Sequence, residues 1–254
     1  MPGPFDFDPD ELEAGPDDPP DPSPEERAAW EAWRGKKERY ARRVLGPPAG
    51  VVGHSIIPFP LGGALHQYYH PKLPDALTGG GGGTAILTGE LSPSDGEGPS
   101  NRAFNNYELA MFTRERFTKQ ARQAPDGDTP FNRAAARIAA FLNPLARYLT
   151  EADVTLHPGE TMEFPADFDE EIGGACLVVA AVPVPKGPRI VTDPPKPARF
   201  GLLCPIVVTR KEMNWARKHG GHALLEKLDD AGHFPFSDPG RKVVIGGLLG
   251  GTLK

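Results

Sequence analysis

Residues 202–244 have the sequence LLCPIVVTRKEMNWARKHGGHALLEKLDDAGHFPFSDPGRKVV, and their pattern decides the fold of the chain. The first seven residues are mostly apolar or β-branched, which is typical of a buried strand. Thr209 and Glu212 have the spacing of a capping box, so we expect a helix to begin there and to stop at Gly220 and Gly221. A second short helix then follows, with its leucines facing inward, and ends near Gly232.

Further strands and one long helix precede this stretch. Runs of β-branched and aromatic residues, separated by Gly, Pro, Ser and Asn, predict strands within residues 50–59, 65–70, 84–91, 105–117, 176–184 and 201–209. Apolar residues from Phe131 to Leu149 recur at steps of three and four, as in an amphipathic helix, which Pro144 should kink or divide near Asn143. Because strands and helices do not alternate as βαβ units, we predict an α+β fold with a mixed or antiparallel β-sheet and flanking helices.

The amino-terminal 22 residues form a separate acidic, Pro-rich tail. Residues 1–26 contain ten Asp and Glu and no Lys or Arg, whereas residues 27–254 hold 28 basic and 24 acidic residues. The net charge of −6 therefore belongs to the tail. We expect residues 1–22 to be disordered, since they cannot bury enough apolar surface to offset the entropy of ordering. The tail is a solubilising extension, a mimic of nucleic acid or a shield for a basic face.

An amphipathic basic helix is predicted for residues 23–45. Ser23 and Glu26 form a capping box, and Trp30, Trp33 and Tyr40 lie on one apolar stripe. We expect the helix to dock through its tryptophans while its basic residues stay solvated: Lys36, Lys37, Arg39, Arg42 and Arg43. The alternative is contact with nucleic acid or a membrane surface, or an architectural role. Residues 46–254 then form the main domain.

Five consecutive glycines, from Gly79 to Gly83, raise the question of a nucleotide site. A P-loop requires a lysine after the glycines and a helix whose amino terminus meets the phosphate. Here the glycines are followed by Thr84 and an apolar strand pattern. The run is therefore interpreted as a flexible turn.

Metal-binding and nucleophilic signatures are also missing. His66 and His70 lie in a predicted strand, and three more histidines flank helix ends without the spacing of a zinc site: His219, His222 and His233. The residues GHS from Gly53 to Ser55 lack the closing glycine of a nucleophile elbow. The carboxylates from Asp167 to Glu171 have the pattern of a solvated loop. We assign no catalytic, cofactor-binding or metal residues.

The cysteines and the hydropathy pattern indicate the compartment. Cys176 and Cys204 lie in apolar runs, where a cysteine behaves as a small buried hydrophobe. No apolar stretch reaches the length of a membrane span, and the amino terminus is acidic where a signal peptide is basic. We therefore expect a cytoplasmic protein in a reducing environment.

The carboxyl-terminal third resembles the suppressor of fused domain family. That family has a helix of the form E-x-x-x-A-x-x-H-G, then ALL-x-x-L, then a tail ending in D-x-x-R. The matching positions here are Glu212, Ala216, His219, Gly220, Ala223, Leu224, Leu225, Leu228, Asp238 and Arg241. Upstream, YELAMFTR, IAAFLNPLARYL and HPGETMEFP are similar to a strand, the central helix and a turn of the family. The resemblance runs from about Leu65 to about Val244.

The resemblance implies a suppressor of fused-like, non-enzymatic protein-binding domain, in which the matching residues have packing roles. Animal members have a second domain that helps to clasp Gli-type transcription factors. This chain stops soon after the first domain, so Gli binding is not transferred. A single-domain form implies a bacterial member, and the resemblance implies that such a member binds an unidentified protein, either as an immunity protein against a secreted toxin or as an uncharacterised binding module. No nucleic acid, membrane, cofactor or small-molecule substrate is expected. The alternative is a hydrolase or metal-dependent enzyme with an unrecognised site.

Overall fold

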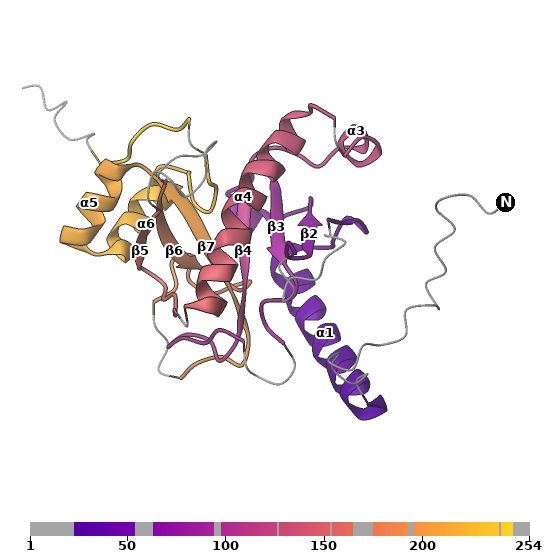
Figure 1. Cartoon of the computed structure of the whole chain (residues 1–254). Coiled ribbons are helices and arrows are strands. Elements are labelled where there is room, and N and C mark those ends of the chain that lie inside the picture. Colours follow the sequence, from indigo (N-terminus) through magenta and orange to yellow (C-terminus); the bar gives the residue numbers. More distant parts are fainter. Residues whose placement is uncertain are drawn as a thin grey trace, which may run out of the picture.

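A mixed sheet of seven strands forms the centre of the molecule (Figure 1). The computed structural model describes residues 23–53, 63–93, 98–125, 127–152, 154–164, 175–192, 196–238 and 240–245. The strands lie in the order β1-β2-β3-β4-β7-β6-β5. Their bounds are β1 Val52–Gly53, β2 Gln67–His70, β3 Thr84–Thr88, β4 Tyr107–Thr113, β5 Thr161–Phe164, β6 Ala175–Ala181 and β7 Gly201–Val208.

A parallel pair joins the two halves of this sheet. β4 and β7 pair through three residues each, from Tyr107 opposite Gly201 to Leu109 opposite Leu203. The other pairs within the seven-stranded order are antiparallel. Between β4 and β7 the described residues form two helices and two strands, the kind of long connection that a parallel pair requires. The predicted α+β class, with a mixed sheet and flanking helices, is confirmed.

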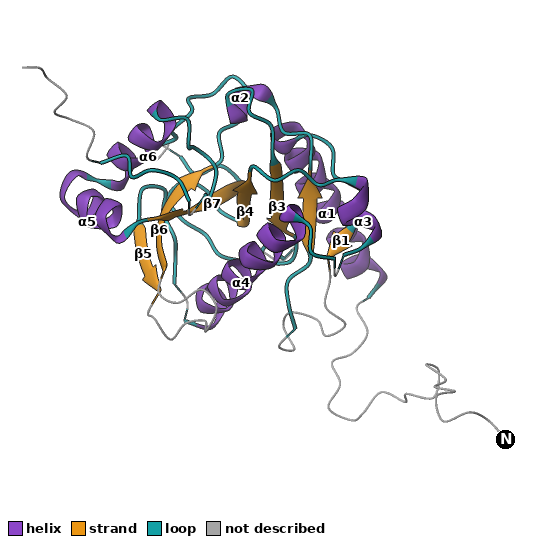
Figure 2. Ribbon diagram, turned by 90° about the horizontal axis from the view of Figure 1, so that it is seen from above, coloured by secondary structure: helices purple, strands orange, loops and turns teal. Residues whose placement is uncertain are grey.

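Helices cover both faces of the sheet (Figure 2). The long helix α4, Pro130–Glu151, packs on β3 and β4, and the short α3, Lys119–Gln123, belongs to the same side. The helices on the opposite face are α1 Pro24–Leu45, α2 Asp75–Thr78, α5 Arg210–His219 and α6 Gly221–Asp230. No helix in the described ranges is long and apolar enough to cross a membrane.

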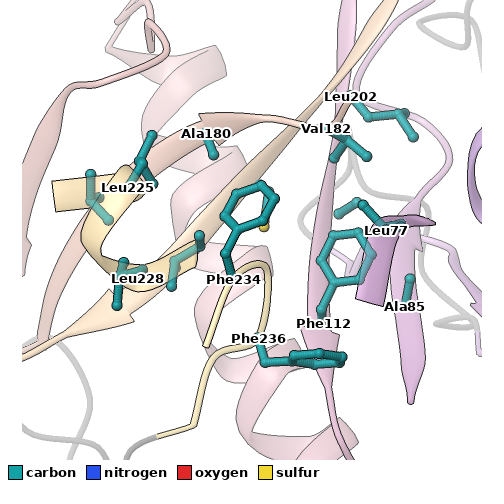
Figure 3. Close-up of a cluster of buried hydrophobic side chains, with 14 of the residues drawn as sticks. Leu77, Ala85, Phe112, Ala180, Val182, Leu202, Leu225, Leu228, Phe234 and Phe236 are labelled. Atoms are coloured by element: carbon teal, nitrogen blue, oxygen red, sulfur yellow. The ribbon is translucent and has the colours of Figure 1, made fainter. Parts of the chain in front are cut away.

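Each face of the sheet carries its own hydrophobic core. On the α4 side, Leu109 and Met111 of β4 pack among the residues of α4. On the other side, Phe112 joins the leucines of α6 and two further phenylalanines, Phe234 and Phe236 (Figure 3). Because successive strand residues point to opposite faces and both faces are covered, every position of β4 is buried.

Beyond their three paired residues, β4 and β7 diverge, and the segment after α6 closes the gap. Phe236 bridges to Phe112, and the backbone N–H of Ser237 donates to the Phe112 carbonyl at 2.9 Å. The Ser237 hydroxyl accepts from the Val207 N–H at 3.2 Å and donates to the Pro205 carbonyl at 3.4 Å. Pro205 has no N–H to offer to a neighbouring strand, which suits the point where β4 leaves β7. We call this opening the β4–β7 fork.

The predicted helix boundaries are largely confirmed. Ser23 and Glu26 form a reciprocal capping box that opens α1, and Thr209 and Glu212 form another that opens α5. Gly220 follows α5 with a φ of 94°, a conformation that favours glycine. The inward face predicted for the next helix is also confirmed, since its leucines are fully buried: Leu224, Leu225 and Leu228.

Three expectations for the helices are wrong. α4 is not divided at Pro144, because buried residues on both sides of the proline hold the turns against the sheet, so that part of the expectation is wrong, and the alternative of a kink stays a prediction. Trp33 of α1 is buried but Trp30 is 50% exposed, because the first turns of α1 extend beyond the sheet (Figure 1). Lys37 is not solvated, since it forms a buried ion pair with Glu108.

The sequence patterns also missed short elements. We did not predict α2, α3 or β5, which contain only four or five residues each. Of the first predicted strand, residues 50–59, the described part contains the two residues of β1, and residues 54–59 lie outside the described residues. Residues 1–22, Ser55 and residues 167–171 lie outside the described residues, so the predictions for the tail, the GHS sequence and the acidic loop stay predictions.

Candidate functional site

The glycine run forms the turn between α2 and β3, and a strand rather than a helix follows it. Gly79 ends α2 in a left-handed conformation with a φ of 65°. Gly83 has a φ of 132°, and a Cβ atom there would lie 2.5 Å from the Thr113 carbonyl and 2.7 Å from the ring of Phe236. The glycines therefore let the chain turn and let β3 approach the fork closely. Since no helix begins here, the loop lacks the geometry of a P-loop.

The two histidines near β2 each contact a polar group of a neighbouring segment. His70 is buried in β2, with Nδ1 2.8 Å from the Gly46 carbonyl oxygen, and its burial lowers its pKa. His66 precedes the strand and lies 3.1 Å from a carboxylate oxygen of Glu90. They serve to hold neighbouring segments.

The three histidines near the carboxyl-terminal helices do not converge on a metal site. The His219 ring stacks on Trp215 with centroids 4.3 Å apart, and His222 packs against Gly159. Burial, followed by the nearby arginines, lowers the pKa of His233. Among the described residues, no group of three or more His, Cys, Asp and Glu could hold a metal ion.

The two cysteines are free thiols inside the cores, as the sequence predicts. Burial raises the pKa of Cys204, and it also raises that of Cys176 in spite of the opposing charge of Arg210. Both side chains are therefore neutral thiols at neutral pH. Neither has the lowered pKa that activates a cysteine nucleophile.

Glu212 connects the start of α5 to the segment beyond α6. Its carboxylate accepts hydrogen bonds from the Thr209 N–H and the Val244 N–H, each at 2.9 Å, and forms an ion pair with Arg241. Burial alone would raise the pKa of Glu212, but the hydrogen bonds from Arg241 and these backbone groups outweigh it, so the pKa lies below its usual range. We expected Glu212 only to cap a helix.

A second buried ion pair fixes α1 to the sheet. The Lys37 ammonium donates to the carbonyls of Gly89 and Ser92 at 2.9 and 2.8 Å and to the Glu108 carboxylate at 2.8 Å. Glu108 also accepts from the Thr88 hydroxyl at 2.6 Å. All three donors of the lysine are therefore used. A cavity of about 510 Å³ lies beside this pair, between α1 and strands β2 and β3.

A larger cleft of about 1070 Å³ opens on the α4 side of the β4–β7 fork. The apolar residues of its lining include Met111, Phe141, Cys176 and Val207. Its walls come from the first half of α4, the ends of β4 and β7, and the start of α5. Four arginines and two carboxylates stand among its lining residues: Arg114, Arg133, Arg137, Arg210, Glu115 and Asp238.

Sequence reasoning did not find this cleft. Its arginines meet because α4 packs on β4 and because β7 pairs with β4, and no pattern in the sequence indicated either contact. The one local signal was the spacing of Arg133 and Arg137, which lie four residues apart on α4 and so on one face of it.

Comparison with known proteins identifies the family. A family model described as Suppressor of fused protein (SUFU) matches residues 87–242, from β3 to the segment that pairs with Glu212. A chain of a solved structure described as "the Sufu-Fu complex crystal structure" has a similar fold, with a TM-score of 0.51 and 13% sequence identity, over 85% of this chain and 92% of that chain. No curated protein matches the sequence. Since the family model covers more than half of the residues, the chain belongs to the suppressor of fused family.

Proposed function

We propose that this chain is a non-enzymatic protein-binding domain of the suppressor of fused type. The observation that carries the proposal is the match of the family model to residues 87–242. Further support comes from the similar fold of a chain solved in a Sufu-Fu complex. The open cleft, lined by both apolar and charged residues, has the composition of an interface core surrounded by a polar rim.

The finer proposal is an immunity role, in which the chain neutralises a toxin by binding it. This role goes beyond the family match, which supports protein binding alone. Such binding depends on a few large anchors, often Trp, Tyr or Arg. Trp30 is a candidate anchor, because it is half exposed on α1 and carries the Arg34 guanidinium 4.8 Å from its ring centroid.

Affinity capture of a partner by the full chain, followed by calorimetry with the purified partner, tests the binding function. We expect a one-to-one complex, and a rise in apparent stability of about 2.7 kcal/mol at a hundredfold excess over Kd. Expression of the partner in cells, with and without this chain, tests the immunity role, since a toxin should arrest growth only when expressed alone. One equivalent of bound metal whose removal unfolds the protein would contradict the proposal and favour a metal-dependent enzyme.

A further inference from the structure

The cleft beside the β4–β7 fork has room for a segment of another protein. Its volume of about 1070 Å³ is at the upper limit of small-molecule pockets, which span roughly 300–1,000 Å³. Phe141 and the half-buried Val207 are among its lining residues, so an occupant can bury apolar side chains against them.

An occupant of this cleft does not bind as an additional β-strand of the sheet. At the fork, Ser237 already engages the Phe112 carbonyl, the Val207 N–H and the Pro205 carbonyl. Since these backbone groups have their partners, recognition has to come from side chains.

The charged side chains of the rim favour carboxylates. Arg137 is exposed on α4 and has no ion-pair partner in the described part of the chain. Arg133 pairs with Asp128, but more than half of each side chain is exposed, and such surface pairs exchange easily. Arg114 is held in place, because it lies 4.3 Å from the ring centroid of Phe236 and donates to the Gly232 carbonyl. Guanidinium groups bind carboxylates through two parallel hydrogen bonds.

Two helices also begin at the cleft, and the dipole of α4 adds to the positive field, whereas Glu212 in the first turn of α5 compensates the positive end of that helix. Pro130 at the start of α4 and Arg210 at the start of α5 are lining residues. The first turn of α4 contains no acidic residue that would compensate its positive end. The field of the arginines is therefore reinforced at the same rim.

We propose that this cleft binds an extended acidic segment of the partner protein. Carboxylates of the segment pair with Arg133, Arg137 and Arg114, and apolar side chains between them pack against the apolar lining residues. This inference depends on the proposed protein-binding function and specifies the chemistry of the partner.

The test uses the full chain and a fluorescent peptide in which Asp alternates with Leu and Phe, with a Lys-for-Asp peptide as the matched probe. The double variant Arg133→Glu and Arg137→Glu should weaken binding of the acidic peptide about tenfold or more, which corresponds to ~1.4 kcal/mol or more. The double variant Arg27→Glu and Lys36→Glu makes the same charge change on exposed positions of α1 and should leave the affinity unchanged. Raising the salt from about 50 to about 500 mM should also weaken binding. The double variant Arg133→Gln and Arg137→Gln is a milder second variant, because it removes the two positive charges without reversing them.

Equal affinity of the acidic peptide for wild type and for both cleft variants would overturn the proposal, and so would equal binding of the Lys peptide. Binding only after the acidic residues of 1–22 are changed to Asn and Gln would also overturn it, because the chain's own amino-terminal segment would then be the occupant. If a captured partner binds wild type and cleft variants equally, the cleft is not its binding site, but the proposed protein-binding function still stands. If the acidic peptide binds through the arginines but no protein partner is found, the proposed protein-binding function is refuted. The assignment of the cleft as a site for acidic segments then still stands.

Discussion

The Glu212 carboxylate lies 2.6 and 2.8 Å from the two terminal nitrogens of the Arg241 guanidinium, and both side chains are almost completely buried. The pair joins the first turn of α5 to a segment that follows α6. Its two parallel hydrogen bonds fix the guanidinium plane against the carboxylate. Glu212 and Arg241 are also two of the positions at which the sequence resembles the suppressor of fused family.

Arg241→Leu should lower the free energy of unfolding by about 3–5 kcal/mol, because it leaves the Glu212 carboxylate buried without its partner. Urea unfolding monitored by tryptophan fluorescence measures the effect. Lys242→Leu removes a charge from the neighbouring exposed position and is the control. Equal stability of the two variants would show that the pair is not a stability element.

The same pair predicts a dependence of stability on pH. The pKa of Glu212 is lower in the folded chain than in the unfolded chain, where it is about 4.3. Its contribution is therefore complete above about pH 5 and disappears as the pH falls through the folded pKa. The stability difference between wild type and Glu212→Gln should be constant from about pH 5 to 7 and should shrink below about pH 4. A difference that grew on acidification would refute this assignment.

Lys37→Met should destabilise the protein by about 3–5 kcal/mol, since the buried Glu108 would lose its cation. Lys36→Met changes the adjacent exposed lysine of the same helix and should have little effect. Thermal melting of both variants makes the comparison. Similar melting temperatures would mean that α1 is not fixed through this ion pair.

Leu225→Ala removes a fully buried side chain of α6 and should cost about 2–5 kcal/mol. Glu226→Ala, at the next and exposed position, is the control. Chemical denaturation of the two variants distinguishes them. An unchanged midpoint for Leu225→Ala would place the wrong face of α6 in the core.

Gly83→Ala should be strongly destabilising, whereas Gly81→Ala should be tolerated. A Cβ atom at Gly83 would overlap the Thr113 carbonyl and the Phe236 ring, and the φ of 132° is unfavourable for alanine. At Gly81 the nearest atom is the mobile end of the Arg114 side chain, at 3.2 Å. The two melting temperatures test this, and equal values would show that the run is only a flexible spacer.

The features predicted well from the sequence depend on residues close together in the chain. The capping boxes at Ser23 and Thr209 and the leucine face of α6 each involve contacts within one or two turns, so their spacing is visible directly. Trp30 and Trp33 share one stripe, but their burial depends on how far the sheet extends beneath α1, which the helix sequence does not contain.

The candidate cleft and the buried ion pairs depend on topology. Lys37 and Glu108 are 71 residues apart, and their contact exists only because α1 lies over the loop after β3. The basic rim likewise requires α4 to pack on β4 and β7 to return beside β4. Local patterns supply the strands but not their order, so these residues could not be brought together by sequence reasoning.

The closure of the β4–β7 fork by Phe236 and Ser237 constrains the order of folding. During synthesis, β4, α4 and β6 leave the ribosome well before residues 234–237. The β4–β7 fork therefore stays open while the chain is growing, because the residues that close it are not yet made. Contacts between such distant segments slow folding, and incomplete chains expose apolar surface that promotes aggregation. The nascent protein should therefore depend on chaperones until these late residues emerge, although most of its strands are already present.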